Sequence, residues 1–402
     1  FFHNKKAYGI RMNIKNKHVS DIYLSISHFI DHFIMLIFAK AAYDAGREFG
    51  LGYEEIIVFG VLGFILFGAV APVASILANK YSRSVLMVIF HFGIGISAII
   101  CSFASTPWEL SIGLGLIGVF AAIFHPVGIA MLLKNSKKLG YRLGINGVFG
   151  NMGVAAAPLI TGYLLLISDW KLSFILPGIA CILYGVIFLL ALKDEPKTVQ
   201  TKKENERDDV FAPQWRRALL ALALTTTSGG FIFGAMTFII PRYFELQLTG
   251  ITSSVAVTGL IASMVYAIAG FTQIGAGLLI DRFPAKPILF VIGVGQVIFI
   301  YLASTVSDLQ LFFVTLVATS FVFGQIPIID TIMSRYIPDK SRGNVLSVKF
   351  ALNLGAGASV LPISSLMLKH GYELSNLFVV MSFMAMFVVL ASLILPSEQR
   401  TK

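Results

Sequence analysis

Three ionisable side chains lie close together in a stretch near the start of the sequence that is otherwise apolar. His28 and His32 are four residues apart and Asp31 is three residues after His28, so a helix would place them on one face. A carboxyl group removed from water can exchange a proton near neutral pH, and a neighbouring histidine can share that proton or titrate itself. Asp31 is therefore the first candidate for proton coupling, with His28 and His32 as its partners.

Two other uses fit the same three side chains. A hydrogen-bond cluster would only fix this helix against a neighbour. Histidine and carboxylate ligands also suit divalent transition metals, so His28, Asp31 and His32 form an alternative metal site that needs a further ligand from another helix.

Further polar residues interrupt apolar stretches later in the chain. His125 precedes Pro126, and a proline frees a backbone carbonyl one turn earlier, so a polar residue beside the kink often faces water or substrate. The alternative for His125 is a packing role. Asp330 and Lys349 are expected to form a charge pair, which either opens and closes with a gate or stays static. The other candidates for the same site are amides: Asn151, Gln325 and Asn353.

The composition indicates that the chain is a membrane protein. The chain has 402 residues, of which 56% are hydrophobic and 13% charged, and its mean hydropathy is +0.82, whereas soluble domains are about 25% charged. Cys101 and Cys181 lie inside apolar segments and support neither a disulfide nor a metal site. The net charge of +10 is interpreted as loop charge that orients the protein, and we expect no nucleic-acid partner.

Motifs for other chemistry are missing from the sequence. It contains no GxxxxGK[ST] phosphate loop, no HExxH pair, no zinc-finger spacing and no nucleophile elbow. The sequence therefore predicts neither an enzyme nor a pump driven directly by ATP. We expect no cofactor, with the proton gradient as the energy source.

Twelve apolar segments are each long enough to cross a hydrocarbon core about 30 Å thick. They predict an all-α polytopic membrane protein with twelve transmembrane helices. The segments are 19–41, 55–78, 85–105, 108–133, 144–167, 171–192, 217–241, 252–280, 286–305, 309–335, 344–368 and 374–395.

The basic residues test this count. With twelve helices, 25 of the 31 Lys and Arg residues fall on the side of both termini and five fall in the opposite loops, among them Lys40 and Arg242. Such a bias marks the cytoplasmic side, so we expect both termini to be cytoplasmic and the protein to lie in the cell (inner) membrane. The predicted parts are a basic tail (1–17), a six-helix bundle (18–192), a cytoplasmic linker (193–216), a second six-helix bundle (217–396) and a short tail (397–402).

The two bundles repeat each other at an offset of about 201 residues. FAAIFHPVGIAML (120–132) aligns with FVFGQIPIIDTIM (321–333), and Asn151-x-Gly153 aligns with Asn353-x-Gly355. A shared offset across several helices predicts two parallel six-helix repeats, related by an axis along the membrane normal, with a substrate site between them.

At this point the sequence resembles the major facilitator superfamily over essentially its whole length. GLLIDRFPAK (277–286) looks like that family's loop between helices 8 and 9, and SILANKYSR (75–83) looks like a degenerate copy between helices 2 and 3, with Asn79 in place of Asp. The resemblance implies an inner gate in which a carboxylate accepts from a helix N-terminus and basic residues pair across the halves. The alternative is that these residues only end the helix at the interface. The gate residues are Asn79, Lys80, Arg83, Gly277, Asp281 and Arg282.

The fifth segment carries a second resemblance. Gly144, Gly153, Pro158 and Gly162 have the spacing of the motif found in the family's antiporters, which favours export. The alternative is ordinary packing of small residues. The arginine that many drug–proton antiporters carry in helix 4 is absent, which counts against the standard multidrug subtype.

A narrower resemblance rests on SHFIDH (27–32), REFGL (47–51) and FHPVG (124–128), which look most like the fosmidomycin-resistance group. The drug substrate of that group is not carried over.

The fold resemblance implies that helices 1, 4, 7 and 10 line a central cavity. We therefore expect a monomeric, proton-coupled secondary transporter that moves a small organic solute by alternating access. Its site would lie between Asp31, His28, His125, Gln325 and Asp330. The alternatives are a carrier of divalent metal or of an iron–siderophore species, and a membrane sensor that transports nothing.

Overall fold

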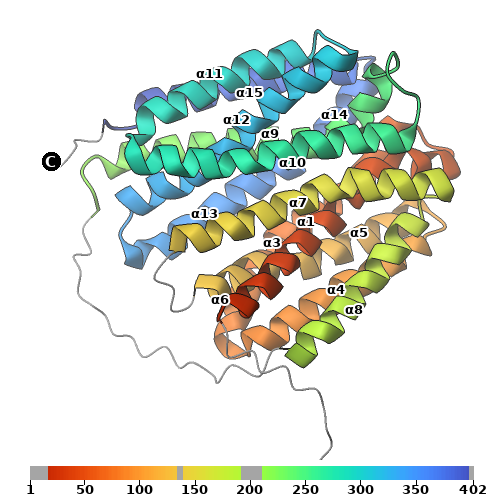
Figure 1. The fold of residues 1–402 in the computed structure, drawn as a ribbon, viewed down its shortest axis with the longest axis horizontal. Coiled ribbons are helices and arrows are strands. Elements are labelled where there is room, and N and C mark those ends of the chain that lie inside the picture. Colours follow the sequence, from red (N-terminus) through yellow and green to blue (C-terminus); the bar gives the residue numbers. More distant parts are fainter. Residues whose placement is uncertain (1–16, 134–138, 192–210, 398–402) are drawn as a thin grey trace, which may run out of the picture.

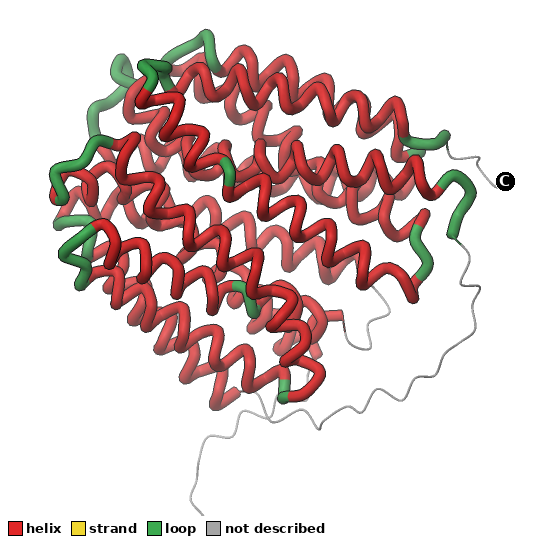
Figure 2. Tube along the Cα trace, turned by 180° about the vertical axis from the view of Figure 1, so that it is seen from behind, coloured by secondary structure: helices red, strands yellow, loops and turns green. Residues whose placement is uncertain are grey.

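The computed structural model describes residues 17–133, 139–191 and 211–397, and all regular structure among them is helical (Figures 1 and 2). Twelve helical spans in these residues are long and apolar enough to cross a membrane. The predicted fold class is therefore confirmed. The tail 1–16, most of the linker and the end 398–402 lie outside the described residues.

The first half of the chain forms six spans, two of which are composite. The second span is built from three consecutive helices, and the fourth contains a π-helical segment. The elements are α1 (Lys17–Glu48), α2 (Tyr53–Ile56), the 3₁₀ turn η1 (Ile57–Gly60), α3 (Val61–Lys80), α4 (Arg83–Ser102), α5 (Pro107–Ala121), the π-helix η2 (Phe124–Gly128), α6 (Ile129–Leu133), α7 (Leu139–Ile167) and α8 (Leu172–Ala191).

The second half also forms six spans, and only its fifth span is divided. The fourth span, which is the counterpart of α5–η2–α6, is one continuous α-helix although it also contains a proline. The elements are α9 (Trp215–Gln247), α10 (Val255–Arg282), α11 (Ala285–Ala303), α12 (Asp308–Tyr336), α13 (Asp339–Ala358), α14 (Val360–Lys369) and α15 (Leu374–Ile394).

The helices gather into two groups that follow the chain. In Figure 1, α1 to α8 occupy the lower part of the view and most of α9 to α15 the upper part, with α13 level with the left end of α7; α7 and α10 lie side by side at the seam. Further contacts across the seam join α3 to α13 and α1 to α9. We call the end where α1 begins and α15 ends the terminal side, on the left in Figure 1, and the opposite end the far side.

Two helices continue on the far side well past the predicted ends of their segments. α1 continues to Glu48 and α9 to Gln247, whereas the apolar segments end at residues 41 and 241. Arg242, just beyond its predicted segment, and Lys40, near the end of segment 19–41, were counted with the loops, and both lie inside helices. Both charges are matched by the carboxylate of Glu245, and this allows them to lie inside helices.

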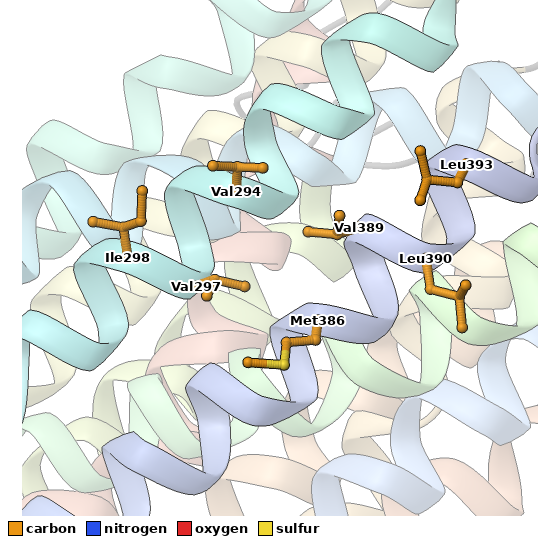
Figure 3. Close-up of a pocket in the computed structure, with 7 residues that line it drawn as sticks. All are labelled: Val294, Val297, Ile298, Met386, Val389, Leu390 and Leu393. Atoms are coloured by element: carbon orange, nitrogen blue, oxygen red, sulfur yellow. The ribbon is translucent and has the colours of Figure 1, made fainter.

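The outside of the bundle is apolar. A groove of about 400 Å³ runs along it between α11 and α15, and its lining includes Val294 and Val297 of α11 and Met386 and Val389 of α15 (Figure 3). All the side chains that line it are apolar, so a bilayer would cover it, and it offers no group that could do chemistry.

Candidate functional site

The histidines of α1 are held in place by α7. His28 Nδ1 is 2.8 Å from the backbone oxygen of Asn146, and His28 Nε2 is 3.1 Å from His32 Nε2. A carbonyl oxygen only accepts, so the Nδ1 proton of His28 is donated to Asn146. In a neutral His28 ring Nε2 is then the acceptor, and His32 donates to it.

The π-helix η2 brings His125 to the same place. Its Nε2 lies 3.5 Å from Asp31 Oδ2, and its ring centroid is 5.3 Å from that of His28 and 5.6 Å from that of His32. Pro126 has no N–H to donate, and a π-turn inserts an extra residue that changes the direction of the neighbouring side chains. Three predicted residues of α1 and one of the fourth span therefore form a single group, which we call the His–Asp cluster (His28, Asp31, His32 and His125).

Asp31 is the most deeply placed member of the cluster. Its side chain is fully buried, and neither carboxylate oxygen has a hydrogen-bond partner among the described residues. A buried charge without hydrogen bonds is costly. The site can avoid this cost in two ways: Asp31 holds a proton, or it stays charged opposite a protonated His125.

The cluster keeps an open side. His32 is half-buried and the side chain of His125 is 23% exposed, while Asp31 and His28 are buried behind them. Aromatic rings surround the group: Phe124 stacks on His28 at 4.8 Å between centroids, and Phe350 of α13 lies 6.0 Å from His125. Because Phe350 belongs to the second half, both halves contribute to the surroundings of the cluster.

Two residues of α7 that support the cluster were not predicted. Asn146 is buried and supplies its backbone oxygen, which leaves no signal in the sequence. Gly150 faces the ring of His28, where an added Cβ would lie 2.6 Å from Cε1. Its position three residues before Gly153, inside the row of small residues, was the one clue available.

The residues that could hold a metal ion differ from the predicted set. One ring nitrogen from each of His28, His32 and His125 lies within 4.8 Å of the others, and Asp31 is not part of this group. At tetrahedral bonds of about 2.0 Å, ligand nitrogens lie roughly 3.3 Å apart. The His28–His32 separation fits this value, and His125 would have to move inward to join them.

Gln325 lies in a separate network. It accepts from Gln296 Nε2 at 2.7 Å and donates to the backbone oxygen of Thr225 at 3.2 Å, so it ties α12 to α11 and α9. Among the described residues, no hydrogen bond or ion pair joins it to the His–Asp cluster. The expectation that Gln325 lies beside Asp31 is not supported by these contacts.

The ion pair between Asp330 and Lys349 is present. It joins α12 to α13 within the second half, and the Asp330 side chain is 52% exposed. The described residues show no bond from Asp330 to the His–Asp cluster either. Lys349 interacts electrostatically with His125 and Phe350 lies beside it, so α13 of the second half borders the cluster that α1 and η2 form with support from α7.

The repeat-related asparagines lie at helix crossings. Asn151 is buried, and an added Cβ on Gly270 of α10 would lie 2.9 Å from Asn151 Cβ. Asn353 is half-buried, and a Cβ on Gly230 of α9 would lie 2.8 Å from its Cα. Both residues therefore mark places where two helices approach closely.

The predicted gate residues do not engage one another. Asn79, Lys80, Asp281 and Arg282 are exposed and Arg83 is half-buried, and no ion pair joins any of them to a described residue. An added Cβ on Gly277 would meet nothing within 4 Å. The terminal side is therefore not latched by these residues in this structure.

The small residues of α7 have unequal surroundings. Gly153 contacts the backbone of Phe29 in α1, and an added Cβ on Gly162 would lie 2.9 Å from the backbone oxygen of Val255 in α10. Pro158 faces Gly259 of α10. A Cβ on Gly144 would meet nothing within 4 Å. The packing interpretation therefore accounts for Gly153 and Gly162 but not for Gly144.

The sequence is similar to known transporters. A family model for the Major Facilitator Superfamily matches residues 24–262 and 247–402. Multidrug resistance protein MdtG of Escherichia fergusonii is 28% identical over 238 residues, which cover 58% of this chain and 57% of that protein. The nitrate/nitrite transporter NrtP of Nostoc punctiforme is 26% identical over 176 residues, which cover 41% of this chain and 35% of that protein. The match spans less than two thirds of either relative's length.

Solved structures show the same fold. A bacterial homologue of the human lysosomal transporter Spinster, in an inward-facing and unoccupied conformation, superposes with a TM-score of 0.73 at 16% identity, covering 95% of this chain and 96% of that chain. A D-xylose–proton symporter superposes with a TM-score of 0.72 at 15% identity, covering 94% and 97%. The chain belongs to the major facilitator superfamily, whose members are transporters rather than enzymes.

Proposed function

We propose that this protein is a proton-coupled secondary transporter of a small organic solute, with Asp31 and His125 as the coupling pair. The observation that carries the proposal is the fully buried Asp31 carboxyl group, which has no hydrogen-bond partner among the described residues and faces a partly exposed histidine. Ionisable groups inside a membrane are usually functional because their burial is costly.

The two sides of the molecule support alternating access. On the far side, α7 and α10 touch closely at Gly162 and Gly259, while on the terminal side the gate residues have no partners among the described residues. The excess of Lys and Arg supports a cytoplasmic terminal side in a cell (inner) membrane. With this orientation, the close contact of α7 and α10 supports a state that is closed on the non-cytoplasmic side.

The coupling of proton and solute movement follows from the protonation states that Asp31 and His125 can adopt. With the proton on Asp31, the group is neutral and its burial costs little. When the proton leaves towards the open side, Asp31 needs a cation nearby, and a protonated His125 or a bound solute can supply it. The state with the proton on Asp31 and the state without it therefore bury different charges. This difference links proton movement to solute movement.

Export of the solute is the direction we favour. The support is the spacing of small residues in α7 that resembles the family's antiporters. The name of the relative MdtG refers to multidrug resistance and that of NrtP to nitrate and nitrite, so the relatives differ in their solutes.

The decisive experiment replaces Asp31 with Asn in protein reconstituted into liposomes with an imposed pH gradient. Solutes are first found by a thermal-shift screen of metabolites and antibiotics at two pH values. We expect Asp31→Asn to lower transport at least about tenfold, equivalent to about 1.4 kcal/mol, and to remove its pH dependence. Asp169→Asn changes an exposed carboxylate and is the matched control. Unchanged transport and pH dependence in Asp31→Asn would overturn the coupling assignment.

A divalent metal ion or metal chelate is the second candidate cargo. The observation in its favour is the convergence of three histidine nitrogens within 4.8 Å. Calorimetric titration with Zn²⁺ distinguishes the two candidates. A metal carrier should bind Zn²⁺ and lose that binding in a His28→Ala/His32→Ala variant, whereas a carrier of organic solutes should show no Zn²⁺ binding that depends on these residues.

A further inference from the structure

A charged side chain crosses the seam of the molecule inside the helical region. Lys40 of α1 is fully buried, forms an ion pair with Glu245 of α9, and donates to Thr258 Oγ1 of α10 at 3.0 Å. The Thr258 hydroxyl in turn donates to the backbone oxygen of Val255 at 3.0 Å. One amine of the first half is thus held by two helices of the second half.

A second cross-seam contact lies beside the first. Arg242 of α9 donates to Glu245 Oε2 at 2.7 Å, so the two carboxylate oxygens of Glu245 are divided between Arg242 and Lys40. The Arg242 guanidinium lies 3.6 Å from the ring centroid of Tyr43 in α1 and 5.6 Å from that of Tyr53 in α2. Cation–π contacts at such distances are attractive.

The helix that resembles the antiporter motif makes room for this arrangement. An added Cβ on Gly162 of α7 would lie 3.4 Å from Lys40 Cε. On the far side of these residues, a crevice of about 420 Å³, lined in part by Tyr53, Arg242 and Tyr372, opens to the surface. Solvent from the far side therefore reaches Arg242, whereas the Lys40 side chain has no exposed surface.

We propose that Lys40, Tyr43, Arg242, Glu245 and Thr258 form a latch that holds the far side closed and that opens reversibly because its charges regain water. A buried ion pair loses hydration on closing, so it stabilises the closed state less than an apolar contact of similar size would. Removing one partner is different, because the charge left behind is buried without compensation.

The arrangement makes the two charged partners unequal. When Lys40 is lost, Glu245 keeps Arg242. When Glu245 is lost, Lys40 and Arg242 face each other as two cations. Asp44, one turn after Lys40 on α1, is the nearby carboxylate that remains, and it is half-exposed. Loss of the Glu245 charge should therefore open the far side more than loss of the Lys40 charge.

Pulsed electron paramagnetic resonance measures this opening directly. The background carries Cys101→Ala and Cys181→Ala, and spin labels are attached at Ser168→Cys, after α7, and Ser253→Cys, before α10, which are both exposed on the far side. We expect a main short distance in this parent. Glu245→Gln should move most of the population to longer distances, and Lys40→Met should move a smaller part. The exchanged pair Lys40→Glu/Glu245→Lys should return towards the parent, because the carboxylate introduced at position 40 would then lie between two cations.

A variant that does not depend on the ion pair keeps the test decisive if one of these proteins fails to fold. Tyr43→Phe keeps the ring under Arg242 and should match the parent, whereas Tyr43→Leu removes the ring and should lengthen the distances. A parent-like distribution in Glu245→Gln, an equal effect of Lys40→Met, or a failure of the exchanged pair to restore the short distance would overturn the proposal. So would equal behaviour of the two Tyr43 variants. The measurement requires neither a solute nor a pH gradient, so its outcome is separate from that of the transport experiment.

Discussion

At Asp31, a carboxyl group without hydrogen bonds to the described residues lies next to three imidazole rings that are tightly arranged. His28 is fixed by Asn146 and by stacking on Phe124, while His125 keeps partial contact with solvent. The fixed position of His28 and the partial exposure of His125 suit a cluster that must exchange protons with one side of the membrane at a time. The spacing of His28, Asp31 and His32 was visible in the sequence, whereas the approach of His125 depended on the π-helix.

Gly150 tests whether the position of His28 matters. An added Cβ would lie 2.6 Å from the ring, so Gly150→Ala should displace His28 from Asn146 and destabilise the protein by about 1–3 kcal/mol, as overpacked sites do. The measurement is the thermal unfolding midpoint in detergent, together with transport.

Gly144→Ala is the matched control on the same helix. Its Cβ meets nothing within 4 Å, and replacing a helical Gly by Ala usually stabilises by roughly 0.5–1 kcal/mol. Equal destabilisation by the two substitutions would contradict the role given to Gly150. A loss of transport in Gly144→Ala without a loss of stability would favour the antiporter-motif interpretation over packing.

Among the elements, η2 has a different helical form from its counterpart in the second half. FHPVG forms a π-helix in the first half, whereas the aligned part of α12 stays α-helical around Pro327. A proline alone therefore does not produce the π-turn. The fourth span is distorted where it meets α1 and the cluster, and this is the position where a change of direction brings a side chain to Asp31.

Pro126→Ala should weaken coupling through this geometry. The new backbone N–H allows an ordinary α-helical hydrogen bond, which would turn His125 away from Asp31. We expect the pH dependence of transport to flatten, while Pro327→Ala, at the aligned position, should leave it unchanged. The pH profiles of the two variants in liposomes provide the measurement. Indistinguishable profiles would mean that η2 is only a packing feature.

The length of α1 and α9 shows that hydropathy alone does not predict where these helices end. Hydropathy ended both helices near their charged residues because a charge in an apolar run usually marks a loop. Lys40 and Glu245 come from different halves and satisfy each other, so the helices continue past them. No window of a single segment contains both partners.

For the whole molecule, the two sides are in different states. The far side has close helix contacts and a charged cluster across the seam, while the gate residues on the terminal side have no partners among the described residues. Because the gate residues make no such contacts here, they can stabilise only a state in which the terminal side is closed. The residues predicted from the family's loop motif would then act when the terminal side closes.

Asp281→Asn and Asn79→Asp test this assignment, because they should change the population of the state with a closed terminal side in opposite directions. Removing the carboxylate at position 281 should destabilise the closed terminal side, so fewer molecules would show the long far-side distance between labels at residues 168 and 253. Asn79→Asp adds a carboxylate to the degenerate first-half motif and should increase that population. The same spin-label pair reports both changes, and shifts in the same direction would contradict the gate assignment.

Composition and local pattern were sufficient for the architecture. Twelve apolar stretches, the charge bias between loops and the repeat offset predicted twelve helices in two bundles, because the low cost of burying apolar helices in lipid depends only on nearby residues. The same holds for the shared face of His28, Asp31 and His32, which one helix determines by itself.

The partners of these residues depended on the tertiary structure. His125 joins Asp31 and Gln325 does not, although both were candidates, because a π-turn and a crossing with α7 decide which side chains meet. Lys40 and Glu245 are about 200 residues apart in the chain and meet only where α1 crosses α9. Contacts between helices depend on how whole helices pack, and that packing is not encoded in the spacing of residues along any one of them.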